Sequence, residues 1–395
     1  MDESRRHVNP NPVLNANIFS RIFFWWLNPI FKIGYERPLE VQDMYNVNKE
    51  DSSDTLGDQL EREWFKELAK VKGTKKKPSL LIALIKCFGW RYSVLGFIVF
   101  VEEGTKVVQP LLLGGLIRYF TPDSKMSDME AYLYAMGVSL CAIVLAVSHH
   151  PYFFTVCKIG MQARIACCSL IYKKSLRLSN EALGKTTTGH IVNLLSNDVN
   201  RFDQAAIFLH FLWVGPLQAI AVLTILWYIM GPSVLAGFTV LLLLVPAQGW
   251  MGKLFSRLRL KTAAQTDKRV RIMNEIISGM RVIKMYCWEK PFEELVKKVR
   301  RQEMAIKVEV FRVDTTRFLS FFVGKHVLYL TVFVPFFVSG QSISTTKFFI
   351  LLAYLTHVRY IAFSLISGTV KQLGTLVACL QRVKVDVFFT PSIIL

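Results

Sequence analysis

Six long apolar segments constrain this sequence more than any other feature. Each is long enough to cross a hydrocarbon core of about 30 Å as a helix rising about 1.5 Å per residue. Hydrophobic residues make up 52% of the 395 and charged residues only 19%, which is too apolar for a soluble chain of this length. The sequence therefore predicts an all-α membrane protein with six transmembrane helices, at roughly residues 92–120, 132–157, 205–230, 233–252, 318–339 and 348–366.

The distribution of basic residues predicts the orientation of these helices. The loop 121–131 carries a single basic residue, Lys125, and the short connections 231–232 and 340–346 carry none. The long connections 158–201 and 253–312 carry seven and sixteen Lys or Arg residues. Because basic loops stay on the inner side of a membrane, both termini and the two long connections should face the cytoplasm. The net charge of +19 flanks spanning segments, which disfavours the alternative of nucleic-acid binding.

The two long connections have the spacing of helices and not of loops. Apolar residues recur at three- and four-residue steps through 159–178 and 189–202, and 253–312 contains few helix breakers. We expect the spanning helices to continue outside the bilayer as rods, with a turn at 179–189 that could dock into a soluble motor. The alternative is that these rods are long helices that pack only on one another.

The first 77 residues form a polar N-terminal region with one apolar run. Residues 18–31 are too few to span a membrane, and they contain Trp25 and Trp26. Tryptophan is enriched at the membrane–water boundary, so this run predicts an elbow helix lying in the interface.

Three charged residues, Glu102, Glu103 and Lys106, interrupt the first predicted span. A charge at the bilayer centre costs about 2.5–3.5 kcal/mol on insertion scales, so these groups should face a partner or a watery cavity. Glu102 and Lys106 are four residues apart, in the order that favours an ion pair within a helix. Glu103 points about 100° away and lacks a partner at that spacing, so we expect it to line a cavity.

Other polar and aromatic side chains lie at depth in the remaining spans. Arg359 lies about eleven residues into the sixth segment, where its guanidinium could bind a carboxylate, sulfate or phosphate, or form a buried salt bridge, for example with Glu103. A single intramembrane histidine such as His149 is more often a hydrogen-bonded packing residue than a ligand. Aromatic side chains usually pack in a core, although they could also complete an amphipathic anion site; the candidates are Phe153, Phe208 and Phe321.

No nucleotide site or catalytic group is evident. The stretch GKTTTG suggests a phosphate-binding loop, but Ser179 stands where the first glycine of that motif belongs, and the stretch follows a helical pattern and not a strand. The sequence also lacks a His/Cys cluster with metal-ligand spacing.

Three other stretches carry a resemblance to a known family. KTTTGHIVNLLSNDVNRFD, GMRVIKMYCWEKPF and SRIFFWWLNPIFKIGYERPLE closely resemble the first transmembrane domain of ABC exporters of subfamily C. Among these the chain is most similar to the short multidrug resistance-associated proteins, which lack an extra N-terminal helical bundle. The resemblance implies a six-helix type-1 exporter domain over 78–385, with swapped helices and coupling helices near 179–185 and 286–299.

The same resemblance implies roles for particular residues and partners. His149, Phe153, Phe208, Phe321 and Arg359 match positions that line the exporter cavity, and with Glu103 they are the predicted substrate contacts. The predicted contacts with ATP-binding domains are Asn180, Glu181, Gly184, Lys185, Tyr286, Trp288 and Glu289. The implied partners are the lipid bilayer, nucleotide-binding domains, a second transmembrane domain and amphipathic organic anions. ATP and Mg²⁺ would serve the complete transporter, with no cofactor in this chain, and the implied address is the plasma membrane.

The end of the sequence departs from the family pattern, since residues 386–395 do not continue into an ATP-binding domain. Two hypotheses follow. The chain is either the membrane-spanning half-module of an ATP-driven exporter, or a non-transporting assembly or regulatory fragment that associates with full-length relatives. An ion channel or secondary carrier is disfavoured by the long inner connections.

Overall fold

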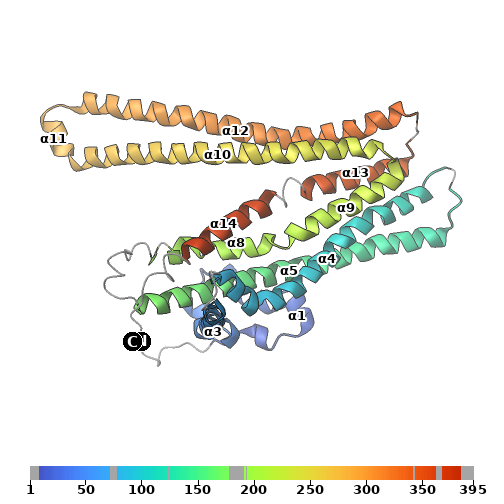
Figure 1. The fold of residues 1–395 in the computed structure, drawn as a ribbon, viewed down its shortest axis with the longest axis horizontal. Coiled ribbons are helices and arrows are strands. Elements are labelled where there is room, and N and C mark those ends of the chain that lie inside the picture. The colour runs from blue at the N-terminus through green and yellow to red at the C-terminus, as the bar shows by residue number, and fades with distance from the viewer. Residues whose placement is uncertain are drawn as a thin grey trace. The chain divides into compact units, whose positions relative to one another are not determined.

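The computed structural model describes residues 9–71, 78–122, 124–177, 191–192, 194–340, 343–361 and 367–383. Within these ranges the chain is helical and contains no β-strand, which confirms the prediction of an all-α protein (Figure 1). Short 3-10 helices cover Pro12–Leu14, Trp25–Leu27, Val41–Asp43 and Lys49–Asp51, and a π-helical turn covers Leu194–Asp198. The α-helices are α1 (Ile18–Ile22), α2 (Asn28–Glu36), α3 (Ser53–Val71), α4 (Leu80–Tyr119), α5 (Asp128–Leu176), α8 (Arg201–Phe208), α9 (Phe211–Met230), α10 (Ser233–Ser278), α11 (Met280–Met285), α12 (Glu289–Val338), α13 (Thr345–Tyr360) and α14 (Ser367–Val383).

Five helical stretches of the described chain are long and apolar enough to cross a membrane. They are α4, α5, the stretch Leu194–Met230, α10 and α12, and they contain the first five predicted spans. The sixth predicted span, 348–366, begins within α13, and its last five residues lie outside the described ranges. The chain is therefore an integral membrane protein.

The chain divides into two compact units. The first comprises Met1–Ala221 with Gly368–Leu395, and the second comprises Val222–Ser367. In the first unit α4 and α5 run side by side, and α3 and α8 pack against α5 (Figure 1). Gly160 of α5 allows the close approach of α8, because a Cβ atom at this position would lie 2.9 Å from the Cα of Asp203.

Helices in the first unit continue beyond their apolar segments, as predicted, but the two continuations differ. α5 extends unbroken to Leu176, whereas the stretch Leu194–Met230 is interrupted between α8 and α9. At this interruption the backbone carbonyl of Phe208 accepts a hydrogen bond from Thr369 Oγ1 of α14 at 3.1 Å. Thr369 is distant from Phe208 in the sequence, so this contact could not be predicted from local spacing.

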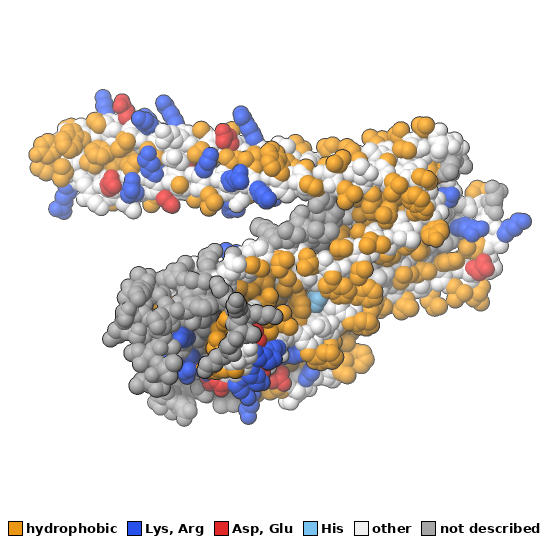
Figure 2. All heavy atoms as spheres, viewed as in Figure 1, with side chains coloured by type: hydrophobic (Ala, Val, Ile, Leu, Met, Phe, Trp, Pro, Cys, Tyr) orange, Lys and Arg blue, Asp and Glu red, His pale blue; other side chains and the backbone are white. Residues whose placement is uncertain are grey.

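The second unit is dominated by α10 and α12, which pack along each other and are joined by α11 at one end of the hairpin (Figure 1). The half of this pair nearest α11 carries charged side chains, and hydrophobic side chains cover the other half (Figure 2). Each helix therefore has one part suited to lipid and one suited to water. This confirms the prediction that the connection 253–312 is a pair of helical rods.

The predicted coupling helix at 286–299 is wrong in its bounds. The short helix between the rods is α11, the residues from Tyr286 to Trp288 form a turn, and α12 begins at Glu289. Cys287 has a left-handed backbone, with φ of 54°, which a helix cannot accommodate. This conformation separates α11 from α12.

The predicted elbow helix at 18–31 is also wrong as a single element. Phe24 is left-handed, with φ of 58°, and divides the run into α1, a 3-10 helix and α2. Pro29 lies in the first turn of α2, where its missing N–H costs nothing.

A buried carboxylate joins the polar parts of α10 and α12, outside the predicted spans. Glu303 of α12 accepts hydrogen bonds from Thr266 Oγ1 at 2.8 Å and Arg269 Nε at 2.9 Å, both on α10. Arg300 Nη1 and Lys307 Nζ, one turn away on α12, approach it at 2.7 and 2.8 Å. Hydrogen bonds from these partners, Lys307 foremost, hold the pKa of the Glu303 carboxyl well below its usual range. We call these five residues the Glu303 clamp.

We predict that Glu303→Gln loosens the α10–α12 pair. The substitution leaves three cations clustered without their carboxylate, so amide hydrogen exchange over residues 262–270 should accelerate about tenfold or more. The matched control is Glu293→Gln, which removes an exposed carboxylate paired with Lys297 and should change exchange little.

The lowered pKa of Glu303 also predicts how protection from hydrogen exchange depends on pH. A carboxylate with a lowered folded pKa contributes its full stabilisation above its ordinary pKa and loses it only as the pH falls further. Protection of residues 262–270 should therefore be the same at pH 7 and pH 5.5 after correction for intrinsic exchange. Equal exchange in both Glu variants would contradict a clamping role.

A candidate charged site within the membrane

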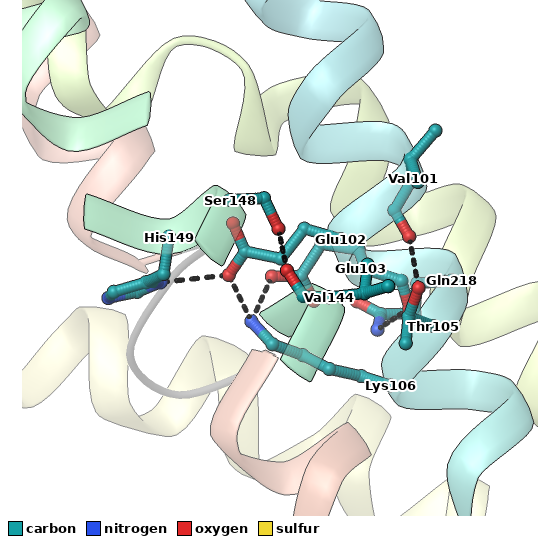
Figure 3. A network of polar contacts seen from close by, with 9 residues as sticks. All are labelled: Val101, Glu102, Glu103, Thr105, Lys106, Val144, Ser148, His149 and Gln218. Atoms are coloured by element: carbon teal, nitrogen blue, oxygen red, sulfur yellow. Dashed lines mark hydrogen bonds and ion pairs between the residues drawn. The ribbon is translucent and has the colours of Figure 1, made fainter. Parts of the chain in front are cut away.

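The charged residues of the first span form a compact ion cluster on α4. Lys106 Nζ lies 2.9 Å from Glu102 Oε1 and 2.6 Å from Glu103 Oε1 (Figure 3). Both glutamates are almost completely buried, with exposed fractions of 2% and 4%. Residues three and four positions apart share one side of a helix, so one lysine can contact both acids.

Helix α5 adds a histidine and an aromatic ring to this cluster. His149 Nδ1 lies 2.8 Å from Glu102 Oε1, and its ring centroid lies 4.7 Å from that of Phe153, one turn further along α5. Glu102 therefore contacts Lys106 on its own helix and His149 on α5. The His149 side chain is 46% exposed, which makes it the most accessible member of the cluster.

A third helix fixes the backbone of the cluster. Gln218 of α9 is buried, and its Nε2 donates a hydrogen bond to the backbone carbonyl of Glu103 at 3.1 Å (Figure 3). The cluster is thus held by α4, α5 and α9 together. We call Glu102, Glu103, Lys106, His149 and Gln218 the intramembrane cluster.

The structure tests the ion-pair partners that the sequence predicts for Glu102 and Glu103. The predicted ion pair between Glu102 and Lys106 is confirmed. Glu103 has no such partner at the i+4 spacing, as the sequence indicates, but Lys106 contacts it at the i+3 spacing. Direct contact between Glu103 and a substrate remains a prediction, as do substrate contacts by His149 and Phe153.

The remaining predicted substrate residues lie on other helices. Phe208 ends α8, and its ring lies 3.3 Å from the position that a Cβ atom on Gly368 would take, so it faces α14. Arg359 lies near the end of α13, in the second unit, and is half-buried. Phe321 lies within α12, and its side chain is outside the described set.

The predicted coupling residues fall into two groups. Asn180, Glu181, Gly184 and Lys185 lie outside the described residues. The other three lie where α11 joins α12: Tyr286 and Trp288 in the turn, and Glu289 at the start of α12. The rings of Tyr286 and Trp288 stack with centroids 5.2 Å apart and are 63% and 48% exposed. Lys284 Nζ lies 2.9 Å from Glu289 Oε1 and bridges this turn.

The first unit contains a second set of hydrogen-bonded polar side chains, which the sequence did not predict. Tyr152 Oη is 3.0 Å from His210 Nδ1, and His210 Nε2 is 3.0 Å from the backbone carbonyl of Tyr92. A carbonyl can only accept, so Nε2 carries the hydrogen and Nδ1 accepts from the tyrosine hydroxyl. The Tyr92 ring stacks on the His210 imidazole with centroids 3.9 Å apart. His210 is therefore a satisfied packing residue, and its partner Tyr152 could be recognised only from the fold.

We predict that Lys106→Met destabilises the membrane domain strongly. Removing the lysine leaves two buried carboxylates without their common cation, and breaking a buried ion pair on one side costs about 3–5 kcal/mol. The midpoint of thermal unfolding in detergent should fall by several degrees or more. Glu102→Gln/Glu103→Gln/Lys106→Met should recover most of this loss, because it removes the charges together.

The matched control for this experiment is Lys125→Met, which changes an exposed lysine in the loop after α4. Its midpoint should match that of the unaltered chain within about 1 °C, since exposed charges contribute little. A midpoint for Lys106→Met that equals the control would mean that the cluster does not stabilise the fold.

Comparison with known proteins agrees with this architecture. Residues 92–372 match the transmembrane region of ABC transporters. The chain is 48% identical over 380 residues to mouse ATP-binding cassette sub-family C member 4, and 45% identical over 382 residues to the human protein of that name. These alignments cover 95% and 96% of the chain but only 29% of each relative, so the chain spans less than a third of their length. The chain therefore belongs to the ABC transporter family, in which it corresponds to a transmembrane region.

Proposed function

We propose that this chain is the membrane-spanning half-module of an ATP-driven exporter of amphipathic organic anions. The observation that carries the proposal is the α10–α12 hairpin, whose polar half is fastened by the Glu303 clamp and ends in an exposed aromatic turn. A helix pair that only crossed a membrane would not need this extension. Its stiffness suits it to transmit movement between a soluble motor and the lipid-embedded helices.

The motor in this proposal consists of ATP-binding domains outside these 395 residues. ATP and Mg²⁺ would bind there and not to this chain. Tyr286, Trp288 and Glu289 would contact such a domain at the exposed turn, together with Asn180, Glu181, Gly184 and Lys185 from the other connection. Closure of two ATP-binding domains would draw the helical rods together and reorient the cavity. The cavity would thus open alternately to the two sides of the membrane as the protein changes between two conformations.

The charge pattern supports one orientation of the chain in the membrane. The basic connections favour a cytoplasmic location for both termini and the exposed turn, so export would move substrate toward the opposite side. Similarity to sub-family C relatives favours the plasma membrane. A second transmembrane domain would complete the cavity.

The proposed substrate class follows from the charges available at depth. Lys106 already contacts two carboxylates, so it has little attraction left for an anion. His149 is more accessible and borders the Phe153 ring, which suits a ligand with one charged and one apolar part. Arg359 on α13 would contribute a guanidinium, the group best shaped for a carboxylate, sulfate or phosphate.

A vesicle assay tests the transport proposal. The chain is reconstituted with and without separately produced ATP-binding domains and a second transmembrane domain from a sub-family C relative, and ATP-dependent uptake of a conjugated organic anion is measured. We expect uptake only in the complete mixture. Tyr286→Ala/Trp288→Ala should reduce it about tenfold or more, because the exposed aromatic contacts with the motor are lost. Absence of uptake in every mixture would favour the assembly or regulatory fragment.

A narrower prediction concerns Arg359. In the complete mixture Arg359→Ala should raise the KM for the anion about ten- to hundred-fold, the worth of a charge-assisted hydrogen bond, while Arg359→Lys should retain part of the affinity. The matched control is Lys347→Ala, which removes an exposed cation from the opposite end of α13. Equal KM values in the two alanine variants would remove Arg359 from the proposed site.

A further inference from the structure

A cavity of about 310 Å³ lies where the N-terminal elbow packs against α4 and α5. All of its lining residues belong to the first unit. Three of them are cations, Arg21 from the elbow, Arg91 from α4 and Lys158 from α5, and most of the others are apolar. Neither the transport proposal nor the intramembrane cluster uses this cavity.

The three cations are neutralised to different degrees. Lys158 Nζ lies 2.9 Å from Asp51 Oδ2 and is paired. Arg91 Nη1 donates to the neutral amide of Gln162 at 3.3 Å, and Arg21 Nη2 donates to the backbone carbonyl of Val13 at 3.0 Å. Among the residues that the structure describes, no carboxylate lies within ion-pair distance of either guanidinium. The cavity therefore presents two guanidinium groups that are not in direct contact with a carboxylate of the described residues, and the amide of Gln162 separates Arg91 from Asp51.

Three aromatic side chains, Phe24, Trp26 and Phe154, also line the cavity. The Phe24 ring meets the Phe154 ring edge-on with centroids 5.2 Å apart, and the indole of Trp26 lies 6.2 Å from the same ring. A small soluble anion would contact the guanidinium groups alone and make no use of these rings. An amphipathic ligand would use both parts.

The depth of the cavity in the membrane indicates which amphipathic molecules are available to bind there. Arg91 directly precedes the first predicted span, 92–120, and Lys158 directly follows the second, 132–157, so both lie at one boundary of the hydrocarbon. The elbow around the cavity exposes Ile18 and Phe19, at 74% and 66%, as a segment embedded in lipid would. Phospholipid headgroups and the first carbons of their chains occupy this level.

We propose that this cavity binds an anionic phospholipid, with its phosphate between Arg21 and Arg91 and the start of its acyl chains against Phe24, Trp26 and Phe154. The volume is at the lower limit of ligand pockets, which suits a headgroup region and not an entire lipid. Two net positive charges favour an anionic headgroup over a zwitterionic one. The bound lipid would join the elbow to α4 and α5.

Lipid retention by the full 395-residue chain tests this proposal. The chain is purified in a neutral detergent, equilibrated with mixed micelles of phosphatidylserine and phosphatidylcholine, and its bound lipids are counted by native mass spectrometry. Phosphatidylserine should be retained in preference to phosphatidylcholine. The apparent affinity for phosphatidylserine should fall about fivefold for each of Arg21→Gln and Arg91→Gln, since each removes one interfacial cation.

Three controls make the outcome decisive. Arg118→Gln removes an exposed arginine from the opposite end of α4 and should leave retention unchanged. Arg21→Lys/Arg91→Lys keeps the charge and should keep most of the preference. Inorganic phosphate at millimolar concentration should not displace the lipid, because it lacks the apolar part.

The proposal would be overturned by equal retention of the two lipids on the unaltered chain, a result that does not depend on any variant folding. Displacement of phosphatidylserine by inorganic phosphate would instead identify a site for soluble phosphate. Equal loss of lipid in Arg91→Gln and Arg118→Gln would show that overall charge, and not this cavity, attracts the lipid. Thermal unfolding of each variant separates loss of binding from loss of fold.

Discussion

A polypeptide inside lipid must satisfy its polar groups without water, and the rest of this structure depends on that constraint. The backbone meets it by forming helices. The side chains of Glu102 and Glu103 meet it by sharing Lys106, and Gln218 reaches across from α9 to the carbonyl of Glu103. The charged cluster therefore links three helices where hydrophobic burial alone gives no strong preference for one helix neighbour over another.

The same constraint acts differently where the helices leave the lipid. α10 and α12 pair along their length. One half of the pair presents apolar side chains suited to lipid, and the other half presents charged side chains, most of them Lys and Arg (Figure 2). Glu303 joins the two rods there through hydrogen bonds that water would otherwise weaken, since this carboxylate is buried between them. One pair of helices thus uses apolar packing in lipid and hydrogen bonds to a buried carboxylate in water. The exposed turn at its end is available to a partner.

The elbow occupies the boundary between these solvents. Its left-handed residue, Phe24, turns the chain so that the ring packs on Phe154 of α5, and the same turn brings Arg21 near Arg91 and Lys158 around one cavity. A continuous helix over 18–31 could not make this turn. The departure from the predicted helix is therefore what creates the cavity for which we propose a lipid ligand.

The sequence by itself determined the helical class, the first five spans and the continuation of α5, α10 and α12 beyond the lipid, because hydrophobic length and helical spacing are local properties. It also determined the Glu102–Lys106 pair, which needs only one helix turn. The contact of Lys106 with Glu103 is equally local, because the two residues are three positions apart on one helix. The tertiary structure decided the approach of His149 and Gln218, the pairing of His210 with Tyr152, and the breaks at Phe24, Cys287 and Phe208. These features depend on residues that are distant in sequence or on single backbone conformations, and neither leaves a periodic signal in the chain.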